Sequence, residues 1–274
     1  VDVLLDYPFT ATDEGRAMLQ IVHDVAPGAE LAFRTGFLSA IDFAQGITEL
    51  ANAGCDVIVD DITYIDQPFF QDGIVAQAVD QVVASGVAYV SAAGNFGEYG
   101  YESDFNGVPA PNGLPGLAHN FAISGTDIYQ NISLTNTETS NFTLVLQWDD
   151  GSPFGSTTTD MDIYLAKDDG SPLFGFNRDN TGGKAVEVLP FTVGEGGAQT
   201  NVLIVNATGT PNVRIKYIVF RGGYQFIQNE HASPVPSTIV GQANAIGAIT
   251  TGAVRYDKVP GNTGGITPEV MSFS

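Results

Sequence analysis

The chain has 274 residues, enough for one large domain or two of ordinary size. Its 43% hydrophobic and 15% charged residues are typical of a globular protein and exclude a disordered chain. With 31 acidic and 10 basic residues, the formal net charge is -21, which disfavours binding to nucleic acids or anionic membranes. No apolar run approaches the roughly 20 residues of a membrane-spanning helix, so we expect no membrane insertion.

The first 95 residues alternate helical and strand patterns. Apolar residues at helical spacing predict helices over 14–25, 40–51 and 74–83, followed by Pro-Gly or Gly residues that end them. Short apolar runs between them predict buried strands over 30–34, 56–60 and 87–92. Strands that alternate with helices of this length indicate a parallel sheet with helices on both faces. Ligands bind such sheets beyond the carboxyl ends of the strands.

The pattern changes after residue 96. Residues 97–117 are rich in Gly, Pro, Asn and Tyr, which predicts a long loop. Short alternating runs separated by turns then predict the strands of an antiparallel β-sandwich. These runs are 142–148, 161–165, 186–189, 201–205 and 213–220.

From Ser237 onward the residues are again small, apolar and strand-like. The predicted organisation is therefore an α/β core, residues 1–117 and 237–274, with a parallel sheet. An inserted antiparallel β-sandwich, residues 118–236, interrupts this core, because exposed loops tolerate insertions.

The segment Ser91-Ala92-Ala93-Gly94-Asn95 follows a predicted buried strand. At the carboxyl end of a parallel sheet, the side-chain amide of Asn95 would point into the ligand crevice. An amide placed there can donate a hydrogen bond to a developing oxyanion, an effect worth about 10²–10³ in rate. The alternative is a strand-to-turn transition in which Asn95 accepts a left-handed backbone conformation.

The segment Val83–Asn95, VASGVAYVSAAGN, closely resembles the one that carries the oxyanion-hole Asn in subtilases, the subtilisin-like serine peptidases. The preceding order of helices and strands, around APGAEL and DVIVDD, resembles the same family. The final block, Ile239–Ser274, is similar to the stretch that leads toward the nucleophilic Ser, and Asp160–Leu165 resembles β-sandwich modules of secreted subtilases. The resemblance implies a subtilisin-like fold, a secreted or cell-surface location, and a nucleophilic Ser and catalytic Asp outside residues 1–274.

The general base of subtilases is a His followed by Gly, and Glu14-Gly15 stands in that position here. The related sedolisins use a Glu at this place with an Asp four residues later, where this chain has Met18. The resemblance therefore implies Glu14 as a base whose helper comes from elsewhere. Asp60 and Asp61, which close the predicted strand 56–60, are the candidates; the alternative is two acidic residues at a solvated edge. A carboxylate acts as a base only where its pKa is tuned toward the working pH.

The resemblance implies a serine endopeptidase that cleaves proteins or peptides through an acyl-enzyme. Residues on both sides of the cleft would hold an extended substrate by strand addition, namely Thr63 and Tyr64 on one side and Ala92, Ala93 and Gly94 on the other. The alternative is a catalytically inactive subtilase-like protein, in which the missing His marks lost catalysis and the β-sandwich serves binding or adhesion.

No cofactor or metal site is firmly predicted. The single Cys55 excludes an intrachain disulfide, and the three His residues show no zinc-binding spacing. A structural calcium ion is left open, because acidic turns could hold one, although they lack the spacing of a calcium-binding loop. The candidate residues are Asp149, Asp150, Asp160, Asp162, Asp168 and Asp169.

Overall fold

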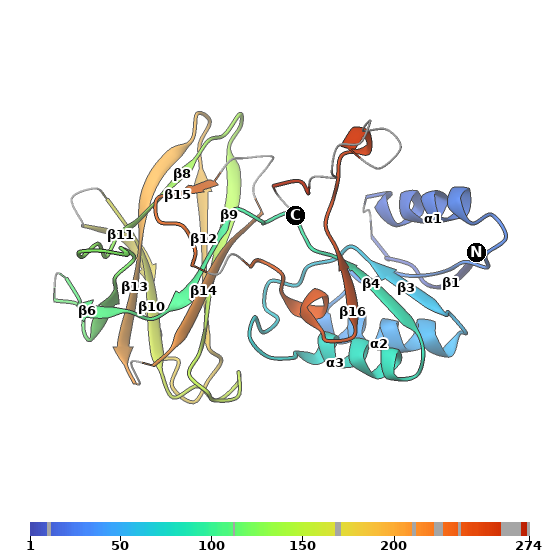
Figure 1. The fold of residues 1–274 in the computed structure, drawn as a ribbon, viewed down its shortest axis with the longest axis horizontal. Coiled ribbons are helices and arrows are strands. Elements are labelled where there is room, and N and C mark those ends of the chain that lie inside the picture. Colours follow the sequence, from blue (N-terminus) through green and yellow to red (C-terminus); the bar gives the residue numbers. More distant parts are fainter. Residues whose placement is uncertain are drawn as a thin grey trace. The chain divides into compact units, whose positions relative to one another are not determined.

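The computed structural model describes residues 1–9, 12–111, 113–167, 171–209, 212–221, 227–234, 237–258 and 270–272. The chain divides into two compact units. The first unit comprises Val1–Gln67, Asp72–Ala93 and Ile239–Gly252, and the second comprises Pro68–Gln71, Gly94–Thr238 and Ala253–Ser274. Figure 1 shows the helices α1, α2 and α3 in the first unit and the antiparallel strands, green to orange, in the second.

The first unit contains the helices and strands that periodicity predicts near the N-terminus. Its helices are α1 (Glu14–Val25), α2 (Ala40–Asn52), α3 (Ile74–Ala84) and the 3-10 helix η1 (Gly241–Asn244). Its strands are β1 (Asp2–Leu5), β2 (Ala32–Arg34), β3 (Val57–Asp60), β4 (Ala88–Ala92) and β16 (Ala248–Thr251). The three predicted helices and the three predicted strands are therefore confirmed to within a few residues.

The parallel strands of this unit form two separate small sheets. One pairs β1 with β2, and the other has the order β16-β4-β3. The apolar faces of α2 and α3 pack on the second sheet, where Ile47, Val79 and Tyr89 are almost fully buried. Buried and exposed side chains alternate along β3: Ile58 is buried, and Val57, on the other face of the sheet, is 57% exposed.

The second unit is built almost wholly of antiparallel strands. They are β5 (Gly100–Asp104), β6 (Gly107–Pro109), β7 (Leu117–His119), β8 (Gln130–Leu134), β9 (Ser140–Asp149), β10 (Asp160–Ala166), β11 (Pro172–Phe176), β12 (Val186–Val193), β13 (Ala198–Thr208), β14 (Arg214–Arg221) and β15 (Ile227–Asn229). The 3-10 helix η2 (Tyr256–Lys258) also belongs to this unit.

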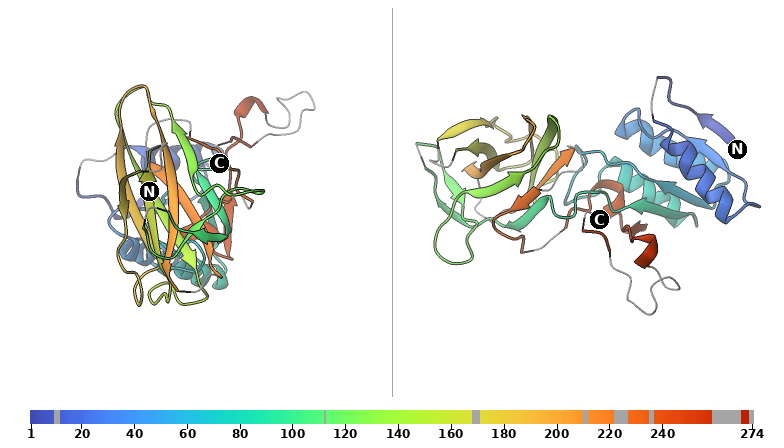
Figure 2. Two further views of the ribbon diagram at one scale, coloured as in Figure 1. Left: turned by 90° about the vertical axis from the view of Figure 1, so that its left-hand side faces the viewer. Right: turned by 90° about the horizontal axis from the view of Figure 1, so that it is seen from above.

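Two antiparallel sheets enclose one apolar core in the second unit. One sheet has the order β12-β9-β14-β5; in the other, β11-β10-β13-β7-β6, strand β13 also pairs with β8, and β8 with β15. The right-hand view in Figure 2 shows these strands curling around a common interior. The largest core side chains alternate along their strands, as the sandwich pattern requires. They include Phe142, Leu144, Leu146, Trp148, Met161, Ile163 and Tyr217.

The predicted fold class, α/β with a subtilisin-like parallel sheet and helices on both faces, is wrong. Among the described residues, strands make up 36% and helices 17%, and most strands are antiparallel. Residues 97–117, predicted as a loop, contain β5, β6 and the first residue of β7, and β5 pairs with β14 more than 100 residues later. Pairing over such a distance leaves no local pattern for a sequence to show. Asp168 and Asp169, named as calcium candidates, lie outside the described residues.

Among the described residues, no helix has both the length and the apolar character needed to cross a membrane.

Candidate functional site

The carboxyl ends of β3 and β4 lie side by side in the first unit. The two strands are parallel, with Asp60 opposite Ser91, so the segments that follow them leave the same edge of the sheet. Asp61 and Thr63 are exposed there. Ala92 ends β4, and Ala93 continues it by donating its backbone N–H to the carbonyl of Thr251 at 2.9 Å. The strand pairing thereby brings the predicted site residues Asp60, Asp61, Thr63, Ala92 and Ala93 to the same edge of the sheet.

Asp60 is buried at this edge and belongs to a hydrogen-bonded network. Its Oδ1 accepts the side-chain amide N–H of Gln242 at 2.9 Å and the backbone N–H of Ile62 at 3.2 Å. Burial raises the pKa of Asp60, while hydrogen bonds from Gln242 and then Tyr89 oppose this shift. The carboxyl therefore ties β3 to η1, a contact between residues 182 positions apart that the sequence does not reveal.

Tyr64 is half-buried, and its hydroxyl already makes a hydrogen bond within the first unit. It donates to the backbone carbonyl of Gly36, and its ring lies 5.9 Å from that of Phe43. Burial raises the pKa of Tyr64 to about 12, so the hydroxyl stays protonated. Tyr64 thus anchors the segment that bears Thr63, a structural contact in addition to the predicted substrate contact.

Glu14 is the first residue of α1, and its side chain is exposed. The helix begins close to β2, because a Cβ on Gly15 would lie only 2.6 Å from Cε2 of Phe33. Asp13 precedes the helix without capping it through its side chain, and it pairs instead with Arg16 at 3.3 Å. This packing places the Glu14 carboxylate in solvent at the N-terminus of α1.

Gly94 and Asn95 directly follow this edge along the chain but cluster with the second unit. Gly94 has φ of 88°, a left-handed conformation that favours glycine. Asn95 comes next and is exposed. Because Glu14 and Asn95 belong to different units, their cooperation in one site stays a prediction.

The second unit has an open polar cavity of about 720 Å³. It lies on the face of β8, β13 and β15 opposite the apolar core, because Ile132 and Leu134 of β8 point inward while Asn131 and Ser133 point outward. Amide, hydroxyl and carboxylate groups line it: Asp127, Tyr129, Asn131, Ser133, Gln199, Asn201, Gln228 and Glu230.

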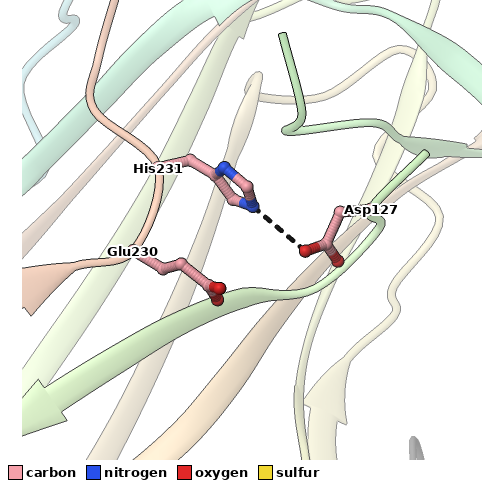
Figure 3. A group of neighbouring side chains, drawn as sticks. All are labelled: Asp127, Glu230 and His231. Atoms are coloured by element: carbon pink, nitrogen blue, oxygen red, sulfur yellow. Dashed lines mark hydrogen bonds and ion pairs between the residues drawn. The ribbon is translucent and has the colours of Figure 1, made fainter. Parts of the chain in front are cut away.

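Three potential metal ligands meet at one end of this surface. Asp127, Glu230 and His231 each have one ligand atom within 4.8 Å of those of the other two. Figure 3 shows Glu230 and His231 on one segment and Asp127 on the segment opposite, with the side chains directed into a shared space. Nε2 of His231 lies 3.1 Å from Oδ2 of Asp127. The sequence analysis missed this cluster, because 104 positions separate Asp127 from His231 and no short motif contains both.

Buried carboxyl groups mark a third region of the second unit. Asp162 on β10 is 3% exposed and accepts the hydroxyl of Tyr164 at 3.0 Å. Burial raises the pKa of Asp162 to about 6, and Asp160 and Glu187 nearby add to the shift. Glu187 on β12 is fully buried, 3.7 Å from the guanidinium of Arg178, and burial raises its pKa as well.

Comparisons with known proteins give only distant likenesses. No family model matches the chain, and no curated protein matches it. Among solved structures, the Clostridium perfringens CspB protease is similar with 13% identity and a TM-score of 0.37, over 79% of this chain and 46% of the protease. A cowpea mosaic virus empty particle is similar with 9% identity and a TM-score of 0.25, over 51% of this chain and 94% of that one. One weak structural neighbour is thus a protease, and neither likeness is close enough to establish a shared fold.

Proposed function

We propose that this chain contributes the base-bearing and oxyanion-binding parts of a serine endopeptidase that acts on proteins or peptides. The observation that carries the proposal is the parallel pairing of β3 and β4, which brings their carboxyl ends to one edge. That edge is where parallel sheets bind ligands. The resemblance of Val83–Asn95 to the oxyanion segment of subtilases supports the same location.

Each proposed role follows from the chemistry of a side chain. Glu14 would accept the proton of a nucleophilic hydroxyl, and the exposed amide of Asn95 would donate to the oxyanion. Thr63, which is exposed, and Ala93 would flank an extended peptide on two sides. Asp60 and Asp61 are the two candidate helpers for Glu14; Oδ1 of Asp60 already accepts from Gln242, whereas Asp61 is exposed. The proposal assigns no serine of residues 1–274 as the nucleophile.

The test measures cleavage of fluorogenic peptides and labelling by a fluorophosphonate, with the protein in its full natural length. Asn95→Ala should lower kcat by about 10²–10³, and Glu14→Gln by about 10²–10⁴. Asn52→Ala and Glu30→Gln, at exposed positions outside the proposed site, are matched controls and should retain activity. Absence of both cleavage and labelling from acidic to neutral pH would refute the proposal, as would full activity of Asn95→Ala.

The polar cavity favours a second function, binding of a hydroxyl-rich ligand such as a carbohydrate without catalysis. Amide side chains both donate and accept hydrogen bonds, which matches the dual character of sugar hydroxyls. A glycan array would test this, with Asn201→Leu and Gln228→Leu as variants in the cavity and Gln45→Leu on α2 as the control. Specific binding that the cavity variants lose and the control keeps would support it, and no binding to any glycan would refute it.

A further inference from the structure

We propose that Asp127, Glu230 and His231 form a binding site for a divalent transition-metal ion, with Zn²⁺ as the best match. The inference rests on the second unit alone. It is therefore independent of the proposed peptidase function, which concerns other residues.

The spacing of the three side chains is close to that of a metal site. Tetrahedral Zn²⁺ with bonds of about 2.0–2.1 Å holds its ligand atoms about 3.3 Å apart. Nε2 of His231 and Oδ2 of Asp127 are already separated by 3.1 Å. All three ligand atoms lie within 4.8 Å of one another, and the exposed Glu230 side chain can rotate to close the remaining gap.

Neighbouring contacts hold two of the ligands in place. Oδ1 of Asp127 accepts the backbone N–H of Tyr129 at 3.0 Å, which directs Oδ2 toward His231. The fully buried side-chain amide of Gln130 makes two hydrogen bonds of 2.8 Å with the backbone of His231. The imidazole also stacks on Phe121, with ring centroids 6.3 Å apart and an angle of 10°. Such supporting contacts orient ligands and increase metal affinity.

The strand pairing explains why these residues meet. Strand β15 runs antiparallel to β8, with Asn229 opposite Ile132, so the residues after β15 lie beside those before β8. The backbone N–H of Glu230 continues this pairing by donating to the carbonyl of Asn131 at 2.9 Å. Two ordered segments of the sheet edge therefore supply the ligands, as a preorganised site requires.

The donor set indicates the class of metal. An imidazole nitrogen suits Zn²⁺, Co²⁺ and related ions, whereas Ca²⁺ and Mg²⁺ prefer oxygen ligands alone. Two carboxylates neutralise the charge of a divalent cation, and the net charge of -21 raises the local cation concentration. Because Asp127 and Glu230 also line the polar cavity, the coordination positions left by the protein face that cavity. They can take water or an oxygen atom of a bound ligand.

The test is isothermal titration of the 274-residue chain with ZnCl₂, and with CaCl₂ for selectivity. We expect one Zn²⁺ equivalent to bind with saturation, and Ca²⁺ to bind at least about tenfold more weakly. His231→Gln and Asp127→Asn should each weaken Zn²⁺ binding by about tenfold or more. His23→Gln and Glu195→Gln change an exposed His and an exposed Glu outside the site and are the matched controls.

A spectroscopic measurement separates loss of a ligand from loss of folding. Co²⁺ in place of Zn²⁺ should give visible absorption bands that His231→Gln shifts or abolishes, while its circular dichroism spectrum stays that of the parent protein. Zn²⁺ binding that is absent, or equally strong in His231→Gln and Asp127→Asn, would overturn the proposal. Equal weakening by His23→Gln would overturn it as well, because that residue lies on α1 in the first unit.

Discussion

His119 makes the stability of the second unit sensitive to acid. The imidazole is fully buried, with Nδ1 accepting the backbone N–H of Asn106 at 3.1 Å and Nε2 lying 3.0 Å from the hydroxyl of Tyr101. Because Nδ1 accepts a hydrogen bond, the neutral ring carries its proton on Nε2. If Nδ1 were protonated, its N–H would face the backbone N–H of Asn106, and two donors would oppose each other in an apolar core. Burial accordingly lowers the pKa of His119 from 6.5 to about 4.

The size and sign of the effect follow from this shift. The folded-state pKa lies below the unfolded value, so the stability contributed by neutral His119 is complete above 6.5 and is lost as the pH falls toward about 4. The shift corresponds to about 3 kcal/mol. In His119→Asn, the side-chain oxygen can still accept from Asn106, but no group titrates. The loss of unfolding free energy that this substitution causes should therefore shrink by about 3 kcal/mol between about pH 7.5 and about pH 4.

Urea unfolding measures this difference directly. Trp148 is the only tryptophan and is 2% exposed in the same core, so its fluorescence reports on this unit. Comparing the variant with the parent protein at each pH cancels the titration of every other group. His23→Asn, on the exposed surface of α1, is the control and should show no such change. A cost of His119→Asn that is constant across the pH range would refute the reasoning.

Three further predictions test separate features of the structure. The pKa of Asp162 is raised from 3.8 to about 6, so its charged form destabilises the fold increasingly as the pH rises through this range. In the same urea assay, Asp162→Asn should stabilise the fold by up to about 3 kcal/mol at neutral pH and by little near pH 4. The Arg34 side chain is 3% exposed between two carboxylates. Arg34→Ala should therefore lower the free energy of unfolding, followed by circular dichroism, by about 2–3 kcal/mol. Arg16→Ala removes an exposed ion pair and should lower it by under about 1 kcal/mol. Gly94→Ala, which forces a left-handed alanine, should lower stability by about 1–2 kcal/mol in thermal unfolding; an unchanged midpoint would contradict the assigned backbone conformation.

Local pattern alone predicted the three long helices and three of the strands of the first unit, but not β1 (Asp2–Leu5). The predicted helix over 14–25 is α1 (Glu14–Val25), and the predicted strand over 56–60 contains β3 (Val57–Asp60). Such elements can be predicted from the sequence because helical and strand periodicities involve residues only a few positions apart. The alternating runs after residue 140 likewise became strands, for example β9 (Ser140–Asp149).

Only the tertiary structure decided the fold class and the composition of the sites. Alternating helices and strands predict a parallel sheet, but they do not determine which strands pair, and here the parallel strands form two separate sheets. The contact of Asp60 with Gln242 and that of Asp127 with His231 join residues 182 and 104 positions apart. Contacts of this range depend on strand order and register, which arise when the chain packs its apolar faces together and which no short segment of the sequence encodes.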